Sequence, residues 1–64
     1  MTIEKLVDTG IINDMTEIYV RDEDFGLITH GNWYQDNIID HIQDEIECFR
    51  WQDDNRVYID LKTL

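Results

Sequence analysis

The chain contains a single cysteine, Cys48, in a length of 64 residues. One cysteine cannot form a disulfide within the chain, so the fold lacks the cross-link on which many small domains depend. A chain of this length buries only about 60% of the surface that its unfolded form exposes. The sequence therefore predicts one domain, residues 1–64, with a small hydrophobic core, and the lone thiol favours a reducing compartment.

Four segments have the period-two alternation of apolar and polar residues that is typical of strands. We predict strands over residues 16–21, 27–30, 45–51 and 56–61. Polar turns separate the segments in pairs, one from Asp22 to Gly26 and one over residues 53–55. Each pair therefore predicts a β-hairpin.

Two short helices are expected in addition to the strands. Thr2 can cap a first helix that Gly10 ends, and the spacing of Ile38, Ile39 and Ile42 predicts one face of a second helix. The predicted fold class is α+β, with a four-stranded, largely antiparallel sheet, two hairpins and one or two short helices on one face. The order of the strands does not follow from the sequence.

The third predicted strand is apolar on both faces. Simple alternation places Ile46 and Cys48 on one face and Phe49 and Trp51 on the other, and Cys48 is expected to be a buried small hydrophobic residue. In so small a domain, something must then cover the second face. We expect an interface there, most commonly a homodimer, formed by the aromatic residues Tyr19, Phe49, Trp51 and Tyr58. The alternative is that Phe49 and Trp51 pack under a loop or the first helix.

Charge is the most prominent feature of the composition, because 15 acidic residues face only five basic ones and the net charge is −10. The acids are spread along the chain and 42% of residues are apolar, which favours a folded domain over a disordered acidic segment. Direct binding of DNA or RNA is disfavoured, because affinity for phosphates comes from cations. A basic protein partner, such as the groove of a nucleic-acid-binding protein, fits better. The residues expected to steer that association are Asp22, Glu23, Asp24, Asp36, Asp40 and Asp44. The alternative is that the charge serves solubility alone.

Two segments have the residue types of metal sites without the required spacing. In the calcium-loop pattern counted from Asp22, glycine falls at the fifth position and Trp33 stands where a glutamate is needed. His41 and Glu45 could share a helix face and, with His30, hold a divalent ion, but no zinc motif surrounds them. We expect no metal and no cofactor.

The residues of common catalytic motifs are missing: the chain contains no serine and no glycine-rich phosphate loop. A thin domain also rarely forms the desolvated cleft that catalysis needs. We therefore expect a protein-interaction module that is not an enzyme. One alternative is metal-dependent nicking of DNA by Asp14, Asp53 or Asp54, and another is a purely structural dimeric component of a phage or regulatory assembly.

The location is expected to be cytoplasmic. No apolar run approaches the roughly 20 residues that span a membrane. The first six residues also lack the basic start and apolar stretch of a signal peptide. The sequence therefore predicts no membrane partner.

Three segments carry a resemblance to a known group: TEIYVRD (residues 16–22), GNWY (31–34) and QDDNRVYID (52–60). In style and composition, most of the chain resembles the small acidic accessory proteins of bacteriophages and mobile elements in low-GC Gram-positive bacteria. Anti-CRISPR inhibitors come from the same pool, and several of them occupy the nucleic-acid groove of a nuclease. The resemblance implies a phage-encoded inhibitor that acts inside a bacterial host cell as a nucleic-acid mimic. No catalytic or binding residue carries over from it.

Overall fold

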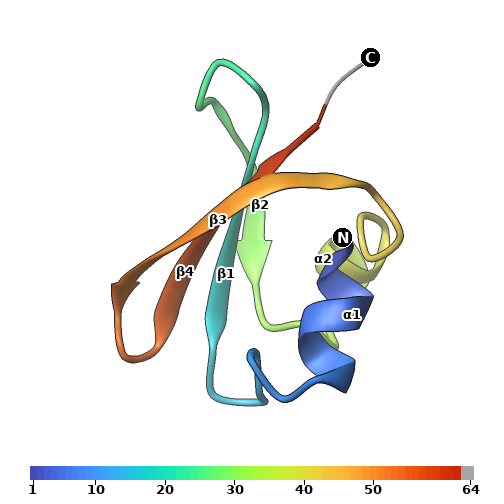
Figure 1. The fold of residues 1–64 in the computed structure, drawn as a ribbon, viewed down its shortest axis with the longest axis vertical. Coiled ribbons are helices and arrows are strands. Elements are labelled where there is room, and N and C mark those ends of the chain that lie inside the picture. The colour runs from blue at the N-terminus through green and yellow to red at the C-terminus, as the bar shows by residue number, and fades with distance from the viewer. Residues whose placement is uncertain (63–64) are drawn as a thin grey trace.

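A computed structural model describes residues 1–62 of the chain. Its elements are α1 (Ile3–Asp8), β1 (Glu17–Arg21), β2 (Leu27–Gly31), α2 (Asp36–Ile39), β3 (Ile46–Asp53) and β4 (Arg56–Leu61). β1 and β2 form one antiparallel hairpin, and β3 and β4 form the other. The predicted α+β class, the four strands and both hairpins are therefore confirmed (Figure 1).

The strand order in the sheet is β2-β1-β4-β3, so the two hairpins meet through a parallel pair in the centre. In that pair Ile18 lies opposite Val57, and Val20 lies opposite Ile59. All four side chains are fully buried. The central strands are thus joined by long-range apolar packing, and no turn connects them directly.

The core lies between one face of the sheet and the two helices. Ten apolar side chains form it, all at most 7% exposed: Ile3, Leu6, Ile12, Ile18, Val20, Ile38, Ile46, Val57, Ile59 and Leu61. α1 and α2 supply three of them and lie together on the right of Figure 1. The helices therefore cover one face of the sheet, as predicted, and leave the opposite face without a helical layer.

The caps predicted for α1 are present. The hydroxyl of Thr2 accepts a hydrogen bond from the Lys5 N–H, and Gly10 follows the helix with φ +82°, a conformation that favours glycine. α2 has only four residues, and its Ile38 is buried while Ile39 is 43% exposed. The prediction that Ile39 shares the buried face is wrong, because a single helical turn cannot direct two adjacent side chains into the core. Within residues 1–62 no helix is long and apolar enough to cross a membrane.

The segment after β2 fixes the loop before β1. The side-chain amide of Asn32 donates to the carbonyls of Asp14 and Thr16, at 2.9 and 3.3 Å. The Trp33 indole N–H donates to the Asp14 carboxylate at 2.7 Å. Asn32 and Trp33 thus have a structural role, which is to hold the start of β1 against the end of β2.

β3 contains two irregularities in its pairing with β4, one between Ile46 and Cys48 and one between Trp51 and Asp53. The extra residue at the first bulge reverses the alternation, since Ile46 lies opposite Leu61 while Phe49 lies opposite Ile59. Ile46, Phe49 and Trp51 therefore share the face that the helices cover. The expectation of a strand apolar on both faces is wrong, because it assumed unbroken alternation.

Candidate functional site

The sheet face that turns away from the helices, called the open face here, carries polar and aromatic side chains. The strand pairing and the alternation of burial along β1 and β4 assign eleven residues to it. They are Glu17, Tyr19, Arg21, Leu27, His30, Cys48, Arg50, Asp53, Arg56, Tyr58 and Asp60. All three arginines of the chain are included, together with three carboxylates. The open face therefore has no net charge, and the net charge of −10 arises from the rest of the molecule.

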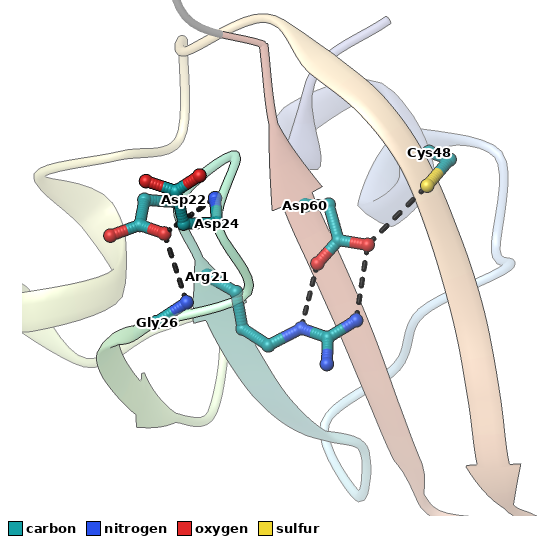
Figure 2. A network of polar contacts seen from close by, with 6 residues as sticks. All are labelled: Arg21, Asp22, Asp24, Gly26, Cys48 and Asp60. Atoms are coloured by element: carbon teal, nitrogen blue, oxygen red, sulfur yellow. Dashed lines mark hydrogen bonds and ion pairs between the residues drawn. The ribbon is translucent and has the colours of Figure 1, made fainter.

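A largely buried ion pair joins β1 and β4 near one end of the open face. The Arg21 guanidinium donates to both oxygens of the Asp60 carboxylate, from Nε at 2.7 Å and from Nη2 at 3.1 Å (Figure 2). Asp60 is 3% exposed. The guanidinium also lies over the Tyr58 ring, 4.3 Å from its centroid, and 5.1 Å from that of Phe25. Arg21 therefore has its charge neutralised and its flat surfaces packed, which favours a structural role.

Aromatic rings cross the open face from β2 to β4. His30 stacks on Tyr19 with ring centroids 5.3 Å apart, and Tyr19 meets Tyr58 edge-on at 5.4 Å. The Tyr19 hydroxyl donates to the Glu17 carboxylate at 2.9 Å, and this hydrogen bond is the main reason that the pKa of Tyr19 is raised. The row is thus an ordered platform of rings, partly exposed to solvent.

Cys48 is exposed on the open face, so the prediction of a buried hydrophobic residue is wrong. The bulge in β3 places it opposite Asp60 and away from the core. Its thiol donates to the Asp60 carboxylate at 3.4 Å (Figure 2), and this hydrogen bond, followed by desolvation, raises the pKa of Cys48. A raised pKa disfavours the thiolate, so this environment does not activate the thiol as a nucleophile.

A hollow of about 410 Å³ adjoins this thiol, between the β1–β2 loop and strands β3 and β4. Basic, acidic and apolar residues line it together: Glu23, Phe25, Glu47, Cys48, Arg50, Asp60, Leu61 and Lys62. The mixed charges give it no strong preference for an anion or a cation. It lies beside the open face, next to Cys48, Arg50 and Asp60.

The structure divides the four aromatic residues that were predicted to form one patch. Tyr19 and Tyr58 lie on the open face, where their rings are in contact. Phe49 is half-buried against the core, and Trp51, opposite Val57, is 40% exposed on the side of the helices. Phe49 and Trp51 therefore do not belong to a common surface with the two tyrosines.

The six predicted acidic residues form two groups at opposite ends of β2. Asp22, Glu23 and Asp24 lie in the loop before β2, which extends from the sheet at the top of Figure 1. The carboxylate of Asp22 accepts hydrogen bonds from the Asp24 and Gly26 N–H groups, both at 2.9 Å, so it stabilises the loop (Figure 2). The other group is Asp36, Asp40 and Asp44, in and after α2.

Within residues 1–62, most of these acids are free to meet a partner. Glu23, Asp24, Asp36 and Asp40 are exposed and make no ion pair there. Asp44 differs, because its carboxylate lies 2.9 Å from His41 Nδ1. The structure thus supports four of the six predicted acids as accessible charges.

The sequence prediction missed three exposed apolar residues in the acidic loop and at the start of β2. Phe25, Leu27 and Ile28 are 61%, 56% and 44% exposed. Phe25 has φ 65°, which is uncommon for a bulky residue. The signal was present as three large apolar residues within four positions, but Phe25 was assigned to a polar turn and Leu27 and Ile28 to the start of a strand.

Apart from Asp54, which is exposed and makes no ion pair in residues 1–62, the candidate metal and catalytic residues are engaged elsewhere. Asp14 accepts from Trp33, and Asp53 accepts from the Asn55 N–H and pairs with Arg56. Glu45 pairs with the N-terminal amine and not with His41. In the part of the chain that the structure describes, no three His, Cys, Asp or Glu side chains are grouped to hold a metal ion.

Comparison with protein-family models, with curated proteins and with solved structures finds no match to this chain.

Proposed function

We propose that this chain is a non-enzymatic interaction module that binds a basic, nucleic-acid-handling protein of a bacterial host cell and competes with nucleic acid for it. In this proposal the module is a phage-encoded inhibitor. The observation that carries the proposal is the separation of charge: the open face is neutral, and the rest of the surface holds the whole net charge of −10. Such a surface attracts a basic groove over a distance and repels nucleic acid.

The accessible carboxylates support this function. Glu23, Asp24, Asp36 and Asp40 are not used in ion pairs within residues 1–62, so they are available to lysine and arginine side chains of a partner. Exposed pairs of this kind contribute only about 0–1 kcal/mol each, so their main effect is on the rate of association.

Apolar contact area is needed for lasting binding, since a few buried anchors supply most of the affinity of an interface. Phe25 supplies such area next to Glu23 and Asp24, in the loop that extends from the sheet, and Leu27 adds to it at the start of β2. The β1–β2 loop, with acidic and apolar residues side by side, is therefore the proposed contact element. A partner for it would have basic residues around an apolar depression.

Affinity capture from a bacterial lysate, at about 0.05 M and about 0.5 M salt, identifies candidate partners. The function is then tested on a purified partner by measuring association rates and competition with its nucleic acid. We expect the variant Glu23→Gln, Asp24→Asn, Asp36→Asn and Asp40→Asn to associate at least about tenfold more slowly, with a weaker salt dependence.

The matched control removes four other exposed charges: Glu4→Gln, Asp8→Asn, Glu47→Gln and Asp54→Asn. Both variants have the same net charge. If the first variant slows association more than the control does, the partner is approached by the acids that the first variant neutralises. An unchanged association rate in the first variant contradicts steering by these acids. Magnesium-dependent nicking of plasmid DNA, lost on substitution of Asp14, Asp53 or Asp54, would instead establish the enzymatic alternative.

A further inference from the structure

We propose that the open face binds the open face of a second copy, so that two sheets pack against each other about a two-fold axis. This inference goes beyond the proposed function, because it assigns the neutral face to self-association and leaves the acidic surface to the basic partner. The argument rests on charge, on the edges of the sheet and on the chemistry of the face.

Charge selects the open face among the surfaces of the molecule. Two copies carry −10 each, so contact through the acidic surface brings like charges together. The open face carries three arginines and three carboxylates, and a copy of itself therefore meets no net repulsion. Arg50 is exposed and pairs with no carboxylate in residues 1–62, which leaves it available to an exposed acid beside the open face of the second copy, such as Glu23 or Glu47.

The edges of the sheet offer poorer contacts than its face. On β2, the side-chain amide of Asn37 donates to the His30 carbonyl at 2.8 Å and to the Thr29 hydroxyl at 2.7 Å, so the edge is partly closed. On β3, two bulges interrupt the regular row of backbone groups. Covered edges and bulges are features that prevent strand-to-strand association. A dimer that extends the sheet is therefore disfavoured relative to one that packs face to face.

The open face has the composition of an interface and a limited area. Tyrosine and arginine are enriched at protein interfaces, and Tyr19, Tyr58 and Arg50 are central to this face. A small specific interface buries about 1,000 Å² in total, or about 500 Å² from each copy. That is roughly an eighth of the 4199 Å² that the chain exposes. We therefore expect a weak dimer, with a dissociation constant on the order of 1–100 μM.

The test is analytical ultracentrifugation of the full chain from about 10 μM to about 1 mM protein, a range that brackets the expected dissociation constant. Runs at about 0.05 M and about 0.5 M salt separate this contact from partner binding. The dimer fraction should rise with salt, because screening weakens the repulsion between the two acidic copies. Binding of a basic partner should fall with salt, so each proposal can fail without the other.

Two charge reversals of equal size identify the surface. Arg50→Glu changes the open face, and Lys5→Glu changes an exposed residue of α1 by the same amount. At equal salt we expect Arg50→Glu to weaken the dimer at least tenfold and Lys5→Glu to weaken it less than threefold. Arg50→Ala serves as a second variant if the reversal alters the fold, which circular dichroism detects.

Four results overturn the proposal. The first is a monomer at the highest protein and salt concentrations. The second is an equal effect of Arg50→Glu and Lys5→Glu, which would show that only total charge matters. The third is a concentration-dependent change in NMR shifts that spares Tyr19 and Tyr58, because the copies would then meet elsewhere. The fourth is binding of an anionic polymer such as oligothymidylate to the two tyrosines at low salt, with no dimer, because the polymer and not a second copy would then occupy the open face.

Discussion

Arg21 and Asp60 form a two-point ion pair across the parallel strands β1 and β4, with nitrogen–oxygen distances of 2.7 and 3.1 Å. The carboxyl side chain of Asp60 is the one charged group in residues 1–62 that is buried. The pair joins the two hairpins at the junction where no turn connects them. It therefore stabilises the parallel pairing of β1 with β4, which local sequence does not determine.

Removing one member of this pair should destabilise the protein strongly. Asp60→Ala leaves the Arg21 guanidinium half-buried without its partner, and we expect a loss of about 3 kcal/mol in the free energy of unfolding. The double variant Arg21→Met, Asp60→Leu should lose less than Asp60→Ala, since it leaves no unpaired charge. Urea denaturation followed by tryptophan fluorescence measures both. A double variant as unstable as the single one would show that packing of Arg21, and not its charge, is the important contribution.

The elements of the fold were predictable because their signals are local. The alternation of Ile18 and Val20, and of Val57 and Ile59, gives each strand its buried face, and Thr2 and Gly10 define the ends of α1. The parallel pairing of β1 with β4 was not predictable, because it depends on contacts about 40 residues apart in the chain. A chain with two hairpins can join them through any pair of strands.

The open face was only partly predictable. The outward positions of Tyr19 and Tyr58 follow from the alternation in β1 and β4, but the bulge before Cys48 moves the residues from Cys48 to Trp51 to the opposite face, until the second irregularity before Asp53. Nothing in the residues from Ile46 to Cys48 signals a bulge, since glycine is absent there. Because the bulge was not predicted, Phe49 and Trp51 were assigned to the wrong face of the sheet. For the same reason, the sequence did not predict that all three arginines lie on one face.

Asn32 should be intolerant of replacement by aspartate, although the two side chains have the same shape. Its amide donates to the carbonyls of Asp14 and Thr16, and an aspartate in that place has no hydrogen to donate and is near the Asp14 carboxylate. We expect Asn32→Asp to lower the free energy of unfolding by about 2 kcal/mol. Thermal denaturation measures this, with Asn55→Asp in the exposed β3–β4 turn as a matched control of equal charge. If the two variants lose the same free energy of unfolding, the added negative charge causes the loss and the hydrogen bonds of Asn32 do not.

Cys48 should react slowly with alkylating reagents despite its exposure. The hydrogen bond to Asp60 raises the pKa of the thiol, so at pH 8 the folded protein contains less thiolate than the unfolded chain. We expect the rate with iodoacetamide, followed from pH 7 to pH 10 by mass spectrometry, to have its midpoint above about 8.5, the ordinary thiol value. The same chain in denaturant is the control and should show the ordinary midpoint. A midpoint in the folded protein at or below that of the control contradicts the thiol–carboxylate contact.

Asp53 should make a contribution to stability that disappears in acid. The Asn55 N–H donates to its carboxylate, and this hydrogen bond, together with Arg56, lowers the pKa of Asp53. A carboxyl whose pKa is lower in the folded state stabilises the fold above the pKa of the unfolded chain, and the contribution is lost as the pH falls through the folded value. The stability difference between the native protein and Asp53→Asn should therefore be constant above about pH 5 and shrink below about pH 4.

Thermal denaturation of both proteins from pH 7 to pH 3 measures this difference at each pH. The comparison removes the general effect of acid on so acidic a chain, because neutralising the other carboxylates affects both proteins alike. Asparagine can still accept the hydrogen bond from Asn55, so the variant isolates the charge of Asp53. A difference that is the same at pH 7 and pH 3 would mean that the charge of Asp53 does not stabilise the β3–β4 turn.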